Sequence, residues 1–324
     1  MDLHAQIKHP IEDELRHFTE LFDNTLESAN QTLHSVYSHL MQSKGKMMRP
    51  TLMLLLAKGL GGVNDVTYRA ALALELLHTA SLVHDDIVDD SQERRGQLSV
   101  NAMYGNKVAV LSGDYILAQA LEYASRTDDT RIVKSIALLG KHLSEGELLQ
   151  LYNAAATDYN EETYIEIISK KTASLFATCT MCAAMSTKAS EQTVKVCEDF
   201  GRYVGLAFQI KDDIFDYSHN ARIGKPTGND MKERKLTLPA LHVLNTYGEP
   251  RMLDIARRVR DGKASDDEIS TLVDFTKAHG GLEYAEEVMH SYVLRAKNIL
   301  DIIRDEEVRR ALALYADYVA NRDH

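Results

Sequence analysis

Two clusters of aspartates carry the most specific chemical signal in the sequence. Each has the form DDxxD and closes an otherwise apolar segment, SLVHDDIVDD in the first case and FQIKDDIFD in the second. At about 100° per residue, the first and last carboxylates of such a motif lie about 40° apart on one helix face. Like charges so placed repel one another and are costly to bury unpaired, which favours a ligand-binding role. The six residues are Asp85, Asp86, Asp89, Asp212, Asp213 and Asp216.

Carboxylate oxygens in two such groups predict a magnesium site. Mg²⁺ keeps several water ligands and is usually held by a few carboxylates together with substrate phosphates. A charged helix end facing water explains one DDxxD motif equally well, but two copies in matching apolar contexts favour the metal site. We therefore expect Mg²⁺ as the cofactor, with three ions per active site when substrate is bound. The ions would bridge the two aspartate motifs through a diphosphate.

Basic residues recur where loops or helix ends are expected, and they could bind that diphosphate. Arginine offers a rigid fork for phosphate oxygens, and lysine offers a compact charge. Each one taken singly is more often a solvated surface residue, but their recurrence beside glycine or near the aspartate motifs favours binding. The candidates are Lys46 and Arg49 (GKMMRP), Arg94 and Arg95 (QERRGQ), Lys171 (SKKTASLF), Lys225 (GKPTGND) and Lys235 (ERKLTLP).

One histidine belongs with these candidates. His78 lies seven residues before Asp85, so on a helix it faces nearly the same way. A lone histidine on an apolar helix is more often a satisfied core residue than a ligand. Its direction toward the proposed site favours a binding role here.

The sequence predicts that helices carry these residues. Only five prolines occur, residues 51–225 contain none, and that stretch is rich in the helix-favouring residues Ala, Leu, Glu, Lys and Met. No run shows sustained strand-like alternation. We expect one all-α domain spanning residues 1–324. The expected helices run from Pro10 to 28, from after Asn64 to about Asp90, and over 107–125, 130–156, 161–186 and 190–217, with a loop at 224–230 and further helices over 237–322.

Composition excludes some classes of function. The 324 residues carry a formal charge of -11, whereas proteins that bind nucleic acid usually have a basic face or a pI above about 9. No apolar run approaches the roughly 20 residues that span a bilayer, and the N-terminal segment lacks the apolar stretch of a signal peptide. We expect a cytoplasmic protein without an integral membrane segment. Cys179 and Cys182 have CxxC spacing, but no second pair completes a zinc site, so core thiols are the better interpretation.

With these residues identified, the chain resembles the trans-isoprenyl (polyprenyl) diphosphate synthase family along nearly its whole length. The resemblance is closest to the medium- and long-chain heptaprenyl, octaprenyl and solanesyl diphosphate synthases. Seven segments follow the family's order and spacing. They are GKMMRP, ELLHTASLVHDDIVDDSQERRG, GDYILAQAL, LSEGELLQL, KKTASLF, FQIKDDIFDY and GKPTGNDMKERKLTLPAL.

The resemblance implies an all-α terpenoid synthase fold, a helical bundle around a deep central cavity, and a homodimer. It implies Mg²⁺-facing carboxylates at Asp85, Asp86, Asp89, Asp212 and Asp216, with Asp213 in the second motif making a contact that can be indirect. It implies allylic diphosphate contacts at Arg94, Lys171, Lys225 and Lys235, with Thr172 and Gln209 flanking the reacting carbons. It implies an isopentenyl diphosphate cradle of Lys46, Arg49, His78 and Arg95. The residues assigned to catalysis are Asp85, Asp86, Asp89, Lys171, Asp212 and Lys225.

The implied enzyme is a prenyltransferase that performs sequential 1'-4 condensation of isopentenyl diphosphate with a farnesyl or geranyl diphosphate primer. Charge on the departing diphosphate is stabilised by metal ions and cationic side chains. The allylic cation that remains is attacked by the double bond of isopentenyl diphosphate, and a proton is then lost. Water would quench the cation, so the cavity should be dry during the reaction.

The helix that bears the first motif also bears on product length. Ser81 lies one turn before Asp85 on the same face, with Ala80 beside it, and both are small. Family members that stop at 15 or 20 carbons typically have a bulky aromatic residue here or two extra residues in the first motif. We therefore expect a medium- or long-chain product for quinone side chains. We also expect the protein to contact a membrane peripherally when it releases product. The alternatives are a geranylgeranyl or farnesyl diphosphate synthase and the catalytic-type subunit of a heteromeric synthase.

Three other classes fit the residues less well. A terpene cyclase pairs one aspartate motif with an Asn/Ser/Glu metal motif and needs no cradle at Lys46 and Arg49. A non-catalytic partner subunit would be expected to have lost an aspartate motif. The pair His84–Asp85 suggests an HD-type phosphohydrolase, but nothing identifies the further ligands that it needs.

Overall fold

The computed structural model describes residues 3–25, 30–42, 45–153, 160–217 and 227–322. Within these ranges the chain is helical, apart from one antiparallel pair of two-residue strands, β1 (Glu93–Arg94) and β2 (Gln97–Leu98). The all-α prediction is confirmed. The α-helices are α1 (Leu3–Lys8), α2 (Glu12–Thr25), α3 (Gln31–Gln42), α4 (Met48–Leu60), α5 (Asp65–Val88), α6 (Val100–Tyr104), α7 (Asn106–Ser125), α8 (Thr130–Asn153), α9 (Glu161–Ile168), α10 (Ser174–Ser186), α11 (Glu191–Phe215), α12 (Asn229–Lys232), α13 (Leu238–Tyr247), α14 (Pro250–Arg260), α15 (Asp266–Ala278), α16 (Gly281–Asn298) and α17 (Glu306–Asn321). Three short turns are η1 (His9–Ile11, 3₁₀), η2 (Ser169–Ala173, π) and η3 (Leu300–Ile302, 3₁₀).

The chain divides into two compact units, each made of three segments. The first unit comprises Met1–Lys141, Leu175–Gly201 and Ile299–Tyr315. The second comprises His142–Ser174, Arg202–Asn298 and Ala316–His324. The first aspartate motif belongs to the first unit and the second motif to the second unit. A single domain over residues 1–324 stays a prediction.

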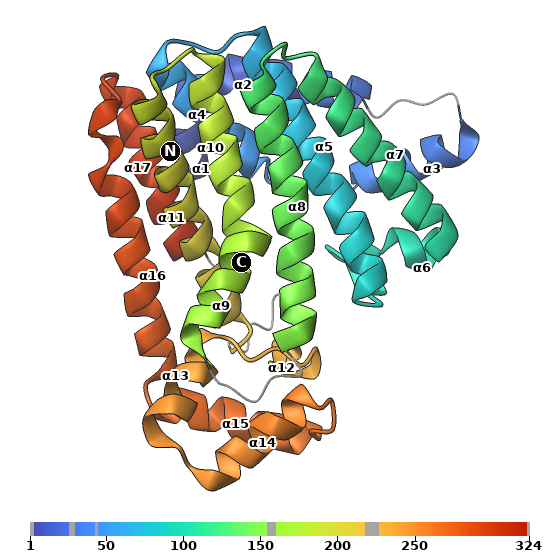
Figure 1. The fold of residues 1–324 in the computed structure, drawn as a ribbon, viewed down its shortest axis with the longest axis vertical. Coiled ribbons are helices and arrows are strands. Elements are labelled where there is room, and N and C mark those ends of the chain that lie inside the picture. The colour runs from blue at the N-terminus through green and yellow to red at the C-terminus, as the bar shows by residue number, and fades with distance from the viewer. Residues whose placement is uncertain (1–2, 26–29, 43–44, 154–159, 218–226, 323–324) are drawn as a thin grey trace. The chain divides into compact units, whose positions relative to one another are not determined.

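In the first unit, α5 and α7 lie side by side (Figure 1). The start of α5 is defined by Asn64, whose side-chain oxygen accepts hydrogen bonds from the backbone N–H groups of Val66 and Thr67 at 2.9 and 3.2 Å. The Thr67 hydroxyl accepts in return from the N–H of Asn64, which completes a capping box. This cap fixes where the helix begins, and α5 then carries the first aspartate motif at its other end.

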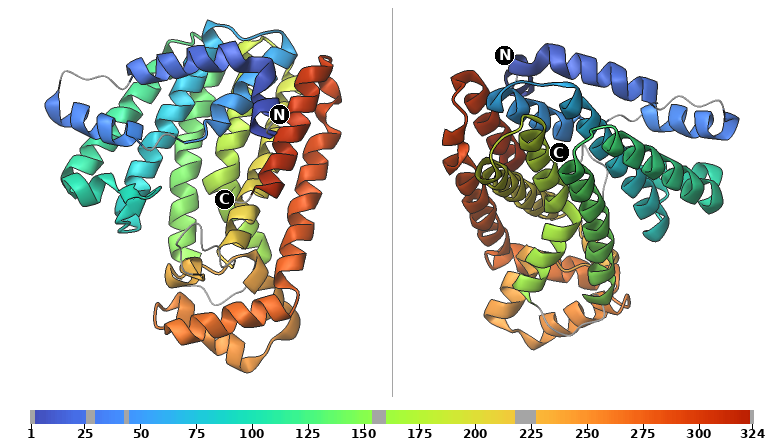
Figure 2. Two further views of the ribbon diagram at one scale, coloured as in Figure 1. Left: turned by 180° about the vertical axis from the view of Figure 1, so that it is seen from behind. Right: turned by 45° about the horizontal axis from the view of Figure 1, so that its top comes forward.

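In the second unit, α13 packs on α15 and α16, and α14 packs on α15 (Figure 2). A core under these helices includes Met252, Ile255, Leu272 and Tyr217, all of them buried. Tyr217 directly follows the second aspartate motif, so this core anchors the end of the segment that carries it.

Most expected helices agree with those observed, and three differences matter. The expected helix 161–186 contains the π-turn η2. The end of the expected loop is helical, because Asn229 and Asp230 begin α12, while residues 224–226 lie outside the described ranges. The sequence prediction did not place α3, α4 or the β1–β2 pair. No helix within the described residues is both long and apolar enough to cross a bilayer.

Candidate active site

The first aspartate motif lies at the C-terminal end of α5. Asp89 is the residue that caps this end, and its N–H donates to the carbonyl of Asp85 at 2.8 Å. A helix C-terminus carries partial negative charge, so carboxylates placed there oppose the helix dipole. The motif therefore needs nearby positive charge.

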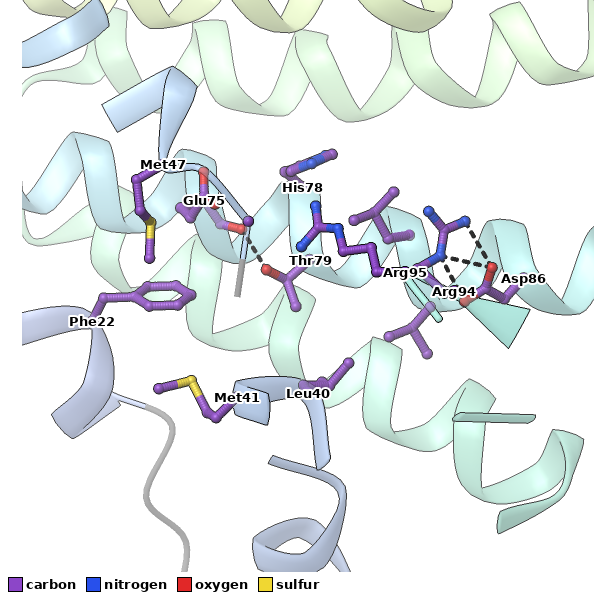
Figure 3. A pocket seen from close by; sticks show the side chains of 13 residues that line it. Phe22, Leu40, Met41, Met47, Glu75, His78, Thr79, Asp86, Arg94 and Arg95 are labelled. Carbon is purple, nitrogen blue, oxygen red and sulfur yellow. Dashed lines mark hydrogen bonds and ion pairs between the residues drawn. The ribbon is translucent and has the colours of Figure 1, made fainter. Parts of the chain in front are cut away.

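Arg94 supplies that charge to the middle carboxylate. Its Nε donates to both oxygens of Asp86, at 2.8 and 2.9 Å, and its Nη2 lies 2.7 Å from Oδ1 (Figure 3). The turn between β1 and β2 folds Arg94 back onto α5, and the Asp86 side chain is almost fully buried. The structure thus pairs a predicted metal ligand with a predicted diphosphate contact.

A small cavity in the first unit contains much of the predicted isopentenyl diphosphate cradle. It encloses about 70 Å³, and Figure 3 shows its polar side chains along α5 with Phe22 and Met41 across from them. His78 and Arg95 line it, and Arg49 bonds His78 through Nη1 and Nε2 at 2.9 Å. The polar residues that line the cavity are Glu75, His78, Thr79, Asp86, Arg94 and Arg95.

The backbone around this cavity is held in an unusual conformation. Met47 and Arg95 both have φ = 54°, in the left-handed region, and both line the cavity. A non-glycine residue in such a region costs of order 1–3 kcal/mol, and such residues cluster at functional sites. A Cβ at Gly45 would lie 3.0 Å from Nη2 of Arg95, so glycine allows this guanidinium to approach. Lys46 lies between the two lining residues Gly45 and Met47 in the chain.

Glu75 was not anticipated from the sequence. It lies one helical turn before His78, and its Oε2 is buried without a hydrogen-bond partner among the described residues. Burial raises the pKa of Glu75, while Arg49 and Arg95 act in the opposite direction. Burial lowers the pKa of His78 well below its usual value, and the charges of Arg49 and Arg95 lower it further. His78 is therefore neutral, and the positive charges of this cluster belong to the arginines.

In the second motif, Asp212 bonds Arg322 near the C-terminus. Nη2 of Arg322 donates to Oδ1 of Asp212 at 2.5 Å and to the carbonyl of Phe208 at 3.0 Å. Arg322 was not anticipated, since it stands 110 residues beyond Asp212 and outside every motif.

Asp213 points into the second unit rather than to its surface. It accepts hydrogen bonds from the Tyr164 hydroxyl at 2.6 Å and from Nε2 of Gln209 at 2.8 Å. Thr172 donates to Oε1 of Gln209 at 2.6 Å, which extends the chain of bonds to a second predicted residue. Burial raises the pKa of Asp213 to about 7, although the bonds from Tyr164 and Gln209 oppose that shift. Tyr164 was missed because a lone tyrosine in a helix carries no motif.

The remaining second-unit candidates lie on neighbouring elements. Asp216 accepts from the backbone N–H groups of Asn229 and Asp230 at 2.9 and 3.1 Å, so it caps α12. Lys235 bonds Glu233 at 2.6 Å. Lys225 lies outside the described residues.

Lys171 and Thr172 lie in the π-turn η2. Nζ of Lys171 pairs with Glu147 of α8. A Cβ at Gly146 would lie 3.0 Å from the backbone nitrogen of Lys171, so the glycine of LSEGELLQL lets η2 approach α8. Single π-turns occur frequently at functional sites.

The two predicted chain-length residues lie on α5. Ala80 is buried, and the partly buried Ser81 donates to the carbonyl of His78 at 2.9 Å. Neither lines the cavity described above, and their role stays a prediction.

Among the described residues no three His, Cys, Asp or Glu side chains already form a metal cluster. The aspartates of the two motifs nevertheless fit Mg²⁺, because they offer hard carboxylate oxygens as ligands. This ion also takes waters and substrate phosphates as ligands. One carboxylate in each motif is neutralised by a guanidinium, which demonstrates that each position accommodates positive charge.

Comparisons with known proteins identify the family of this chain. Residues 30–275 match the polyprenyl synthetase family. The octaprenyl diphosphate synthase of Haemophilus influenzae is 34% identical over 289 residues, 88% of this chain and 87% of that protein.

Two solved structures have the same fold. The geranylgeranyl pyrophosphate synthase of Bacteroides thetaiotaomicron is 45% identical, with a TM-score of 0.88 over 99% of this chain and all of that one. The polyprenyl synthase of Caulobacter crescentus, complexed with calcium and isoprenyl diphosphate, is 29% identical, with a TM-score of 0.92 over 99% of this chain and 98% of that one. The predictions of a terpenoid synthase fold and of a prenyltransferase are therefore confirmed. This chain belongs to the polyprenyl synthetase family.

Proposed function

We propose that this prenyltransferase is magnesium-dependent and extends an allylic diphosphate with isopentenyl diphosphate. The observation that carries the proposal is the pair of DDxxD motifs, each at the end of a helix and each with one carboxylate neutralised by an arginine. The calcium and isoprenyl diphosphate bound to the Caulobacter crescentus relative support it.

Two separate groups of residues would bind the two substrates. Arg49 and Arg95 would bind the diphosphate of isopentenyl diphosphate in the first-unit cavity, beside a neutral His78 that accepts a bond from Arg49. Lys46 would complete this cradle. Bound Mg²⁺ would neutralise charge on the allylic diphosphate as the C–O bond breaks.

A second set of residues would bind and orient the allylic substrate. Arg94, Lys171, Lys225 and Lys235 would contact its diphosphate. Thr172 and Gln209, already hydrogen-bonded to each other, would lie beside the reacting carbons, and Asp213 would hold Gln209 in place.

For the product we propose a medium- or long-chain polyprenyl diphosphate that serves as a quinone side chain. Small residues at Ala80 and Ser81, together with the likeness to an octaprenyl synthase, support it. A second candidate is a geranylgeranyl product, which the 45% identity to the Bacteroides thetaiotaomicron enzyme favours. Chromatography of the dephosphorylated product distinguishes the two.

We further propose a cytoplasmic homodimer that contacts membranes peripherally when it releases product. Exposed apolar side chains one turn apart on α7, Leu111 and Tyr115, support an interface between two copies. The three free, buried cysteines support a reducing compartment. Sedimentation of the purified chain tests the dimer.

The metal assignment is tested by removing each motif in turn. Asp85→Ala and Asp212→Ala should each lower the elongation rate at least about 10²-fold, the scale of losing one electrostatic stabiliser. EDTA should abolish turnover and Mg²⁺ should restore it. Folding should survive in both variants, as judged by circular dichroism. Near-normal rates in both would refute the assignment.

A further inference from the structure

The side chain of Arg322 is held in a slot built from α11. Its guanidinium lies 3.8 Å from the centroid of the Phe208 ring and 5.6 Å from that of Phe215. Only 9% of the side chain is exposed, against 41% for its partner Asp212. The slot thus fixes the arginine, while the carboxylate that it bonds stays accessible.

Within the described part of the chain, the position of Arg322 leaves one of its polar atoms buried and unpaired, which is energetically unfavourable. Nε of Arg322 is buried without a hydrogen-bond partner among the described residues. A buried polar group is normally paired, and a guanidinium on a C-terminal segment could reach water by a change of rotamer. Stacking on Phe208 and the bond to Asp212 offset the loss.

The contact also bears on cation binding. Oδ1 of Asp212 accepts from Nη2 of Arg322, so the lone pair that faces the arginine is occupied. A divalent cation at the same carboxylate would meet both that occupied oxygen and the positive charge behind it. Binding of Arg322 and binding of a divalent cation at Asp212 therefore oppose each other.

We propose that Arg322 is a positioning residue that neutralises and orients Asp212 in the cation-free enzyme and competes with a divalent cation for it. The guanidinium of Arg322, which directly follows α17, would then leave Asp212 as the cation binds. This inference rests on the proposed metal role of Asp212.

The test measures cation binding directly, without substrate. Full-length protein is titrated with Mn²⁺ and free Mn²⁺ is followed by electron paramagnetic resonance, for wild type, Arg322→Gln and Arg322→Lys. Arg322→Gln should bind Mn²⁺ about fivefold more tightly, because it removes a charged competitor from a partly exposed carboxylate. Arg322→Lys, which keeps the charge but loses the planar fork, should fall between the two.

Arg295→Gln is the matched control. Arg295 is an exposed arginine of the same unit that also lies over an aromatic ring, 5.5 Å from the centroid of Tyr292. It has no contact with the motif among the described interactions, so Mn²⁺ affinity should equal that of wild type. Thermal unfolding identifies any variant that fails to fold. If Arg322→Gln fails to fold, the Mn²⁺ affinity of Arg322→Lys decides the test.

Three results would overturn the inference. One is unchanged or weaker Mn²⁺ binding in the folded Arg322 variants. Another is the absence of Mn²⁺ binding to both wild type and Arg322→Gln, since there would then be no cation with which Arg322 competes. The third is weaker binding of inorganic diphosphate without metal while Mn²⁺ affinity stays constant, which would make Arg322 a substrate ligand. Wild-type elongation with Mg²⁺ is assayed in parallel, so failure of the proposed function is recognised separately.

Discussion

Asp86 and Asp213, the middle carboxylates of the two motifs, are both hydrogen-bonded to other side chains. Asp86 bonds Arg94 through both oxygens, and Asp213 accepts from Tyr164 and Gln209. An unpaired carboxyl is costly to bury, so these partners are what permits the two aspartates to lie inside the protein. The indirect role suggested for Asp213 is consistent with this geometry.

Tyr164→Phe tests the bond to Asp213. The change leaves a buried carboxylate oxygen without its donor, so the free energy of unfolding should fall by about 1–3 kcal/mol. The turnover number should also fall, since Asp213 would no longer hold Gln209 in one orientation. Urea unfolding and steady-state rates measure both effects.

Tyr284→Phe is the control for Tyr164→Phe. It removes a hydroxyl of the same unit that donates to Glu161 at 2.8 Å in a partly exposed site. Its effects on stability and on turnover should be small. Equal losses in the two variants would contradict a specific role for Tyr164.

His78 gives a prediction about pH. Its pKa lies well below the usual value of about 6.5, mainly because the ring is buried and next because of the nearby positive charge of Arg49. His78 therefore stays neutral in the folded protein. The unfolded chain takes up a proton at this histidine as pH falls below about 6.5, which destabilises the folded state by up to about 1.4 kcal/mol per pH unit. Stability should thus fall less between pH 6.5 and 5 in His78→Gln than in wild type. Parallel slopes in urea unfolding would contradict the assignment.

At the scale of elements, the helices that carry the motifs were predictable and their interruptions were not. Asn64 has the residue type of an N-cap, and α5 begins where it predicts. The π-turn at Lys171 depends on how closely α8 approaches through Gly146, and the turn at Arg95 depends on a left-handed φ beside Gly45. Both are set by tertiary contacts that local propensity does not encode.

Two glycines of α8 offer a matched pair of variants. A Cβ at Gly146 would meet the backbone of Lys171 at 3.0 Å, whereas a Cβ at Gly140 would meet nothing within 4 Å. Gly140→Ala should therefore stabilise the protein by about 0.5–1 kcal/mol, the usual gain in a helix, with normal turnover. Gly146→Ala should gain less stability and should lower turnover by displacing Lys171. Identical behaviour of the two variants in unfolding and rate assays would contradict this account of η2.

At the scale of the whole molecule, sequence motifs identified the family but not the pairing of its charges. Arg94 and Arg322 reach their aspartates across 8 and 110 residues. Arg94 falls in a recognisable segment, whereas nothing near Arg322 marks it, so only the folded chain connects it to Asp212.

Ser81→Phe tests where the product grows. If the prenyl product extends along the wall formed by α5 below Asp85, the phenyl ring of Ser81→Phe should stop its growth at about 15 to 20 carbons. A packed interior adjusts little to an added side chain. Ser81→Ala keeps the site small and should leave product length unchanged. A folded Ser81→Phe enzyme that still makes the wild-type length would refute the placement.

Magnesium-dependent chain elongation is tested by product analysis of the purified protein alone, supplied with isopentenyl diphosphate, farnesyl diphosphate and Mg²⁺. We expect a series of prenyl diphosphates that lengthens with time by five-carbon steps and ends beyond 20 carbons, with none formed in EDTA. A cyclised hydrocarbon, free phosphate without elongation, or elongation that persists in EDTA would contradict it.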